Sequence, residues 1–365
     1  MIKYIGSKRA LVPLILEAVC SVEGAGTVID LFSGTSRVGH ALKAAGYRVL
    51  ANDHNAYALM LARCYVQADA EDVMEDAGRL VRELNALKGS PGYFTETFCE
   101  RARYLQPKNG ERIDAIREAI AGKALDPELE AVMLVSLMEA ADRVDSTTGL
   151  QMAYLKDWAP RSFNDLELRV PDVLPRARRG KGRAVRLDAL EAAEVLEGDV
   201  AYIDPPYNQH SYLGNYHVWE SLVLWDKPPV YGVACKREDV RKRRSVFNSR
   251  PAFAGAMRRL LDSVRAPVLV VSSSNEGYLS RERMESMLGS LRNGGARVTT
   301  IERDFKRYVG AQIGIHNPRG EKVGKVSHLR NKEYVYLVSR GELSPEPELR
   351  AGSDGRLLGT GHEAG

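Results

Sequence analysis

Short apolar runs of strand character alternate with amphipathic helical runs in this chain, and this alternation limits the folds that it can adopt. Residues 27–69 follow the order strand, helix, strand, helix, and Gly46 stands where the first helix should end. The same order resumes within residues 200–225 and again within 267–291. Strands that alternate with helices predict an α/β fold, in which helices pack on a parallel sheet.

Three other regions depart from this alternation. Residues 71–185 are mostly helical and charged and contain no clear βαβ unit, which predicts an inserted helical subdomain. Residues 296–305 and 331–340 are two strand-like runs with no helix between them, which predicts a hairpin at the edge of the sheet. Residues 341–365 are rich in Gly, Glu and Pro, and this composition predicts a disordered tail.

The composition excludes several classes of protein. The 365-residue chain is 44% hydrophobic, enough for one large domain or two of ordinary size. No apolar run approaches the roughly 18 residues of a membrane span, and the first residues mix apolar and charged positions, unlike a signal peptide. The four cysteines and seven histidines are scattered. We therefore expect no disulfide framework, no metal site and a reducing cytosol.

Positive charge is modest in total but clustered along the chain. The net charge is +4, yet residues 176–186 contain six Arg or Lys and no acid, and residues 236–244 contain six against two acids. Such clusters suit a polyanion such as a nucleic acid. A solvated surface or a linker explains each run equally well.

A turn of small residues follows the first strand, in the motif "IDLFSGTSRVG" at residues 29–39. Here a strand delivers Asp30, Phe32 and Gly34, and a helix follows, so a ligand can approach the backbone closely. Asp53 stands about 20 residues further on, after the next strand, where an acid that binds a ribose is expected. The combination favours an adenosine-containing ligand. Since neither GxGxxG nor GK[ST] is present, a dinucleotide or a triphosphate is disfavoured.

The sequence "DPPY" at residues 204–207 ends another strand in an unusual way. Its prolines fix φ near −65° and leave backbone carbonyls free of the sheet. A planar ligand with an NH₂ group suits this motif, because Asp204 and the Pro205 carbonyl can accept its two N–H bonds while Tyr207 stacks on its ring. The simpler alternative is a turn that ends the strand, with Asp204 as a cap.

The chain also begins with "KYIGSK" at residues 3–8, which taken alone is most simply an N-terminal turn. Together with "DLFSGTSRVG" and "DPPY", in this order and with a long insert before "DPPY", it resembles the S-adenosylmethionine-dependent DNA adenine methyltransferases of the α-group, the Dam-like branch. The resemblance implies a Rossmann-like class I methyltransferase sheet with helices on both faces. It also implies a catalytic domain at 1–70 and 186–340, and a helical target recognition domain inserted at 71–185.

The resemblance further implies roles for individual residues. Those implied to bind S-adenosylmethionine are Tyr4, Lys8, Asp30, Phe32, Gly34, Thr35, Asp53 and Asp188, with Tyr4 and Lys8 near its methionine part and Asp188 at its adenine. The implied catalytic residues are Asp204, Pro205, Pro206 and Tyr207. Two positions depart from the family pattern: Ser36 replaces the second glycine of the glycine turn, and Gly6-Ser7 stands where the family often has two glycines.

Residues after the tetrad are candidates for contact with the substrate. Asn208, Tyr212 and Tyr216 are expected to line the pocket for a flipped base or to contact DNA, although loop packing explains them equally well. The basic residues expected to contact phosphates are Lys236, Arg237 and Arg241. The basic connection within 303–334 is expected to contact the DNA backbone.

The resemblance implies transfer of a methyl group to the N6 amine of adenine in a specific sequence of double-stranded DNA, after base flipping. It implies a cytoplasmic enzyme of prokaryotic or phage type that is not associated with a membrane. It also implies a cognate restriction endonuclease in the same system, without physical contact between the two proteins. RNA adenine methylation and a catalytically inactive DNA-binding homologue remain as alternatives. Cytosine-N4 enzymes tend toward Ser at the position of Asp204, so this aspartate argues for adenine.

Overall fold

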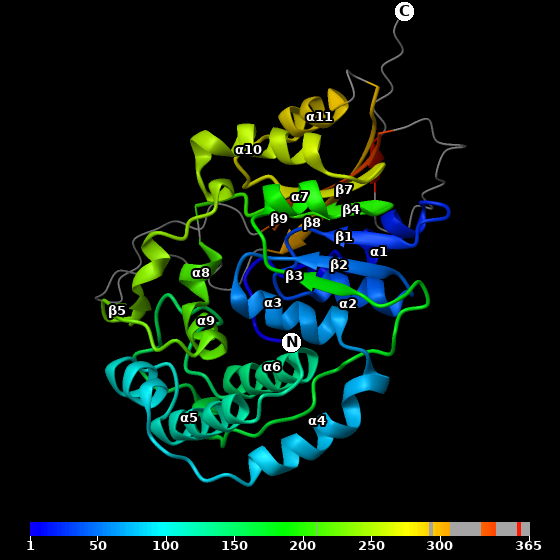
Figure 1. Ribbon diagram of the computed structural model, residues 1–365. Coiled ribbons are helices and arrows are strands. Elements are labelled where there is room, and N and C mark those ends of the chain that lie inside the picture. The colour runs from blue at the N-terminus through cyan, green and yellow to red at the C-terminus, as the bar shows by residue number, and fades with distance from the viewer. Residues whose placement is uncertain (210, 292–294, 307–329, 341–355, 359–365) are drawn as a thin grey trace, which may run out of the picture.

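The structure is a computed structural model that describes residues 1–209, 211–291, 295–306, 330–340 and 356–358 (Figure 1). Its main sheet contains eight strands in the order β10-β8-β9-β7-β4-β1-β2-β3. These strands are β1 (Thr27–Asp30), β2 (Arg48–Asn52), β3 (Arg183–Val185), β4 (Val200–Ile203), β7 (Val268–Ser274), β8 (Arg297–Lys306), β9 (Arg330–Ser339) and β10 (Arg356–Leu358). Two further strands, β5 (Val230–Tyr231) and β6 (Lys236–Arg237), form a separate hairpin.

The strand directions confirm the α/β prediction and add one feature to it. Strands β3, β2, β1, β4 and β7 pair in parallel. Strands β8 and β9 pair antiparallel, as the absence of a helix between them predicted. Strand β9 also pairs antiparallel with β7, so it lies between β7 and β8. The chain therefore passes beyond the position of β9 to form β8 and then returns to fill the gap.

Helices cover both faces of the sheet (Figure 1). One face packs against α1 (Val12–Cys20), α2 (Arg37–Ala44) and α3 (Ala56–Ala62). The opposite face packs against α7 (Ala189–Val195), α10 (Arg250–Ser263) and α11 (Arg281–Gly289). Successive side chains of a strand point to opposite faces, so Val28 belongs to the first core and Ile29 to the second. Each such fully buried side chain contributes about 1.5–3 kcal/mol.

The inserted region builds a third core beside the sheet (Figure 1). Its main helices are α4 (Ala70–Asn85), α5 (Pro107–Gly122) and α6 (Pro127–Arg143), which agrees with the expected helical content. The short helix α8 (Tyr212–Asn215) and α9 (His217–Leu224) follow β4, and α9 packs in the same core. Residues 183–185, the end of the expected insert, instead form β3 at the edge of the main sheet. The insert is thus tied to the sheet at its end and through α9.

A buried ion network joins the insert to α2. Asp69, which is 0% exposed, accepts hydrogen bonds from Lys43 at 2.9 Å and from Arg176 at 2.7 Å. Lys181 lies 2.9 Å from Glu128 and 3.3 Å from Asp72. These acids neutralise part of the basic run 176–186. The run is therefore partly a structural element of the junction.

Several sequence expectations concern residues that the structure does not describe. Most of the basic connection within 303–334, and the tail apart from β10, lie outside the described residues. The contact of this connection with DNA stays a prediction, as does the disorder of the tail outside β10. For residues 356–358 the expected disorder is wrong, because they pair with β8 as a strand. Within the described ranges, no helix combines the length and apolar character needed to cross a membrane. The same residues contain no cluster of three or more His, Cys, Asp or Glu side chains suited to a metal ion.

Candidate active site

The carboxyl ends of β1 and β4 meet at the middle of the sheet. Asp30 ends β1, and Asp204 directly follows β4. From β1 the chain proceeds to β2 and β3 on one side, whereas β4 is followed by β7 on the other side. Open α/β sheets bind ligands in the crevice at such a switch of strand order.

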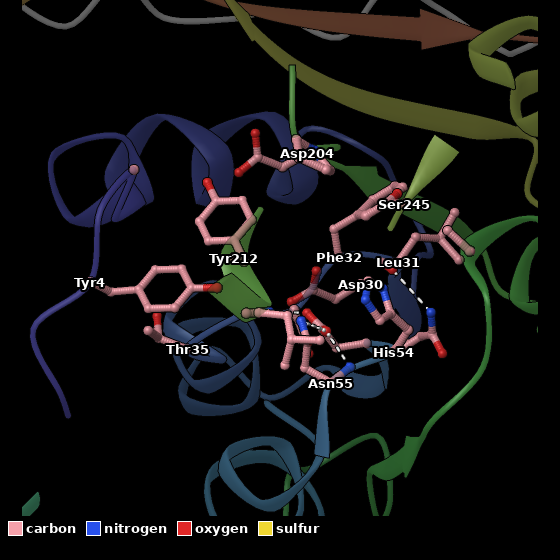
Figure 2. A pocket seen from close by; sticks show the side chains of 18 of the residues that line it. Tyr4, Asp30, Leu31, Phe32, Thr35, His54, Asn55, Asp204, Tyr212 and Ser245 are labelled. Carbon is pink, nitrogen blue, oxygen red and sulfur yellow. Dashed lines mark hydrogen bonds between the residues drawn. The ribbon is translucent and has the colours of Figure 1, made fainter. Parts of the chain in front are cut away.

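A pocket at this edge brings together residues that are far apart in the sequence (Figure 2). The residues expected to bind cofactor or substrate that line it are Tyr4, Lys8, Asp30, Phe32, Gly34, Thr35, Asp53, Asp188, Asp204, Pro206 and Tyr212. Pro205, Tyr207 and Asn208 belong to the same strand exit but are not lining residues of the pocket. The glycine turn, the lysine turn and "DPPY" therefore meet at one site.

The glycine turn and Asp53 are joined by hydrogen bonds. The Gly34 amide donates to Asp53 Oδ2 at 3.1 Å, and the Asn55 amide donates to Asp53 Oδ1 at 2.9 Å. Both Gly34 (φ 49°) and Ser36 (φ 58°) have left-handed backbone conformations. Ser36 therefore keeps the geometry that a glycine would adopt easily at this position, at a cost in backbone strain.

Several buried acceptors around the pocket have no hydrogen-bond partner within the described part of the chain. Both carboxylate oxygens of Asp30, which is 1% exposed, are in this state, as are Ser33 Oγ and Asn55 Oδ1. Burial raises the pKa of Asp30 to about 8, and the charges of Asp204 and Asp53 act in the same direction. Buried polar groups are normally satisfied, so this wall suits a ligand with positive charge and N–H or O–H donors.

Three tyrosine rings form a stack beside the pocket. The Tyr4 ring lies parallel to Tyr212, with centroids 5.2 Å apart, and nearly parallel to Tyr216, with centroids 4.5 Å apart. Tyr216 is buried and its hydroxyl accepts a hydrogen bond from the Ile5 amide. Figure 2 shows the Tyr212 ring between Tyr4 and Asp204. Tyr212 thus faces the pocket, while Tyr216 supports Tyr4 from behind.

Lys8 lies beside the carboxylate of Asp204. Its Nζ atom is 3.2 Å from Asp204 Oδ1, 3.2 Å from the Tyr207 hydroxyl and 3.4 Å from Glu333 Oε2. Burial alone would lower the pKa of Lys8, but Asp204, Tyr207 and Glu333 raise it well above its usual value. Burial raises the pKa of Asp204, and Lys8 opposes this rise. The ammonium therefore stays charged beside Asp204.

Comparison with known proteins identifies the family. Residues 4–287 match the family of D12 class N6 adenine-specific DNA methyltransferases. The chain belongs to this family. The match confirms the resemblance that the three motifs indicated, and the sheet is the Rossmann-like methyltransferase fold that was expected.

Similar curated proteins are DNA modification enzymes. The chain is 31% identical over 307 residues to the type II methyltransferase M.FokI of Planomicrobium okeanokoites, covering 79% of this chain and 47% of that protein. It is 30% identical to modification methylase StsI of Streptococcus sanguinis (78% of this chain, 46% of that protein). It is 27% identical to the type II methyltransferase M.NlaIII of Neisseria lactamica (92% and 97%). The chain thus spans about half the length of M.FokI and StsI.

The three basic residues that were expected to contact DNA phosphates differ in how far they are buried. Arg237 is buried, and its guanidinium makes two 2.7 Å bonds to Asp226 and further bonds to Asp239. This burial is at odds with a phosphate contact, so we correct the expectation and assign Arg237 to the support of the β5–β6 hairpin. Lys236 is half-buried, which lowers its pKa. Arg241 is exposed, with its guanidinium 3.9 Å from the centroid of the Tyr231 ring.

Two residues that line the pocket were not predicted from the sequence. Arg243 lines the pocket and pairs with the fully buried Glu220 at 2.9 Å. Asn248 lines it too, and its side-chain amide donates to the Asn208 carbonyl at 2.9 Å. Arg243 belongs to the basic run 236–244, which suggested a charged surface and not a pocket. The sequence around Asn248 contains no motif that would predict a place in the pocket. By contrast, Asn55 stands two residues after Asp53 and was open to prediction.

Proposed function

We propose that this protein transfers a methyl group from S-adenosylmethionine to the exocyclic N6 amine of adenine within a specific sequence of double-stranded DNA. The observation that carries the proposal is the position of Asp204, at the exit of β4 and on the wall of a pocket with unpartnered acceptors. Family membership supports the same conclusion. RNA methylation and an inactive homologue receive no support from the named relatives.

The residues of the pocket fit the cofactor. When bound, S-adenosylmethionine supplies a methyl group activated by its sulfonium. Asp30, Ser33 and Asn55 offer its ammonium and hydroxyl groups acceptors that no described residue satisfies. Asp53 would hold the ribose, because a carboxylate has about four acceptor positions and the described residues donate three hydrogen bonds to it. Asp188 caps α7 through the Leu190 amide and also lines the pocket, where it would accept from the adenine of the cofactor.

Asp204 and Pro205 would activate the target amine. The N6 lone pair of adenine is delocalised into the ring, which makes the amine a poor nucleophile. Two N–H bonds, one to Asp204 and one to the Pro205 carbonyl, would move the nitrogen toward sp³ character and aim its lone pair at the methyl group. No described residue donates to the Pro205 carbonyl, so it is available. Tyr207 would stack on the base, which must leave the duplex at a cost of a few kcal/mol.

The inserted helices would read the DNA sequence. Helices α4, α5 and α6 lie beside the sheet and pack in a third core, and base reading in a groove requires such a surface beside the catalytic pocket. The type II names of M.FokI and M.NlaIII support a role in restriction–modification. We therefore expect a cognate endonuclease that acts on the same DNA sequence without contact between the two enzymes. The site of action would be the cytoplasm of a prokaryote or of a phage-infected cell.

A labelled-methyl assay tests this proposal. Purified protein would be incubated with S-adenosylmethionine carrying a labelled methyl group and with duplex DNA, RNA or no nucleic acid. We expect label only in N6-methyladenine of duplex DNA, at one sequence that single-molecule sequencing would identify. Label in RNA or in N4-methylcytosine would replace the proposal with one of the alternatives. Cofactor binding by calorimetry without any transfer would favour an inactive homologue.

A further inference from the structure

Glu333 is an acid of the active site that neither the motifs nor the family description assigns. It lies on β9, which brings it beside Ser274 of β7 and Arg303 of β8. Its side chain is only 12% exposed, and its Oε2 atom is 3.4 Å from Lys8 Nζ. A buried carboxylate needs a partner, and among the described residues Lys8 provides the ion pair with Glu333. Yet Lys8 already pairs with Asp204.

Lys8 is therefore shared between two carboxylates. Its ammonium lies 3.2 Å from Asp204 and 3.4 Å from Glu333, and it also donates to the Tyr207 hydroxyl at 3.2 Å. With both acids ionised, the cluster carries one negative charge in excess. If Glu333 were neutral, Asp204 and Lys8 would form a closed neutral pair. The negative charge that Asp204 can offer to an amine is therefore larger when Glu333 is ionised than when Glu333 is neutral.

We propose that Glu333 is a positioning residue: it shares Lys8 with Asp204, so that Asp204 keeps an incompletely neutralised carboxylate to accept the N–H of the target adenine. This inference rests on the proposed function. Glu333 also fixes the direction of the Lys8 ammonium, which in turn orients the Tyr207 hydroxyl. Groups that orient an active-site residue from behind commonly matter almost as much as the residue itself.

Other charged and titratable groups act on this cluster from the surrounding elements. Burial raises the pKa of Glu333, Lys8 lowers it, and Asp204 and Glu276 raise it further. The groups that act on Lys8 or Asp204 from other elements are Asp30, Tyr202, Tyr207 and Tyr212. Lys8 is the cation common to both carboxylates. Removal of either acid should therefore change the titration of the other.

Carboxyl titration of the protein without ligands tests this coupling. Protein with ¹³C-labelled Asp and Glu carboxyls would be titrated by NMR. In Glu333→Gln, we expect the pKa of Asp204 to fall, because a neighbouring negative charge is lost and Lys8 is left to Asp204 alone. In Asp204→Asn, the pKa of Glu333 should fall for the same reason. Unchanged midpoints in both variants would overturn the proposal. The matched control is Glu302→Gln, which removes a β8 carboxylate paired with Arg281 and Lys332.

Single-turnover methylation tests the consequence. We expect Glu333→Gln to slow methyl transfer about 10- to 100-fold, by analogy with the loss when the outer-shell partner of a metal-ligating residue is removed. The acid limb of its pH–rate profile should move to lower pH, while cofactor affinity stays the same. Glu333→Asp should restore part of the rate, and Glu302→Gln should match the wild type. A wild-type rate and profile in Glu333→Gln would contradict the inference.

The two tests separate this inference from the proposed function. If wild-type protein fails to methylate duplex DNA, the proposed function fails, and the carboxyl titration still decides whether Glu333 and Asp204 share Lys8. If wild-type protein methylates DNA and Glu333→Gln does so equally well at every pH, only the inference fails. Loss of the folded state in Glu333→Gln would show in its thermal unfolding. Glu333→Asp, which keeps the charge on a shorter side chain, would then provide the test: a partly reduced rate of methyl transfer would support the inference, and a wild-type rate and pH profile would contradict it.

Discussion

Asp30 and Asp69 are both buried carboxylates, but their surroundings differ completely. Asp69 is 0% exposed and receives hydrogen bonds from Lys43 and Arg176. Asp30 is 1% exposed, and neither of its oxygens has a hydrogen-bond partner among the residues described. One charge is satisfied within the fold at the junction of sheet and insert. The other lies at the wall of the pocket with its acceptors open.

This difference separates a structural site from a ligand site. A buried ion pair that is complete contributes to one arrangement of the chain, and its disruption leaves an uncompensated charge. A buried acid that lacks a partner destabilises the free protein, and such groups concentrate where a ligand completes them. The comparison therefore predicts that changes around Asp69 affect stability, whereas changes around Asp30 and Asp204 affect binding and chemistry.

The largest expected effect concerns catalysis. Asp204→Ala should lower the single-turnover rate of methyl transfer on the order of 10³-fold, because a preorganised acceptor for the target amine is lost. Its affinity for S-adenosylmethionine, measured by calorimetry, should stay close to that of the wild type. Equal loss of cofactor binding and methyl transfer would contradict the roles assigned to this pocket.

The next effect concerns stability. Asp69→Asn should lower the free energy of unfolding by about 3–5 kcal/mol, because Lys43 remains buried without its counter-ion. Denaturant unfolding would measure this loss. The matched control is Asp76→Asn on the surface of α4, where the pair with Arg79 is exposed to solvent and contributes little to stability. Similar losses in both variants would remove the distinction between structural and ligand sites.

The sequence predicted the parts of the fold that depend on local pattern. Strands β1, β2, β4 and β7 and their helices follow from apolar periodicity, and β8 and β9 from the absence of a helix between them. The insertion of β9 between β7 and β8 did not follow, because pairing of distant strands leaves no local mark. Residues 183–185 were likewise assigned to the insert, since three residues are too short a run to indicate a strand.

The same limit applies to the site. Asp30, Asp53 and Asp204 were found because each lies in a contiguous motif at a strand end. Glu333 was missed because its partner Lys8 is 325 positions away in the sequence. Arg237 was assigned to DNA because a basic run reports local charge and not burial. Only the fold shows that Asp226 and Asp239 enclose it.

The pH dependence of Asp30 sharpens the comparison further. The pKa of Asp30 is raised to about 8 in the fold from 3.8, so the folded protein binds more protons than the unfolded chain between these values. Its contribution to stability therefore falls as pH rises from about 4 to 8, by at most about 1.4 kcal/mol per pH unit. Asp30→Asn should remove this slope in thermal unfolding. Binding of a cationic ligand near pH 7 should release a proton from Asp30. Calorimetry in two buffers of different ionisation enthalpy would measure the number of protons released.

The smallest effect tests the strain at the glycine turn. Ser36 has a left-handed backbone (φ 58°), is fully buried, and its hydroxyl has no partner among the described residues. Ser36→Gly should raise the free energy of unfolding by about 1 kcal/mol, since the relief of strain and of an unpaired hydroxyl exceeds the entropic cost of glycine. Denaturant unfolding of Ser36→Gly and Ser36→Ala separates the two causes.

Alanine removes the hydroxyl but keeps the Cβ atom. A gain in stability in both variants would therefore identify the hydroxyl as the source, and a gain in Ser36→Gly alone would identify the backbone strain. A loss of stability in Ser36→Gly would show that the hydroxyl is satisfied in solution, and Ser36 would then belong with Asp69 rather than with Asp30.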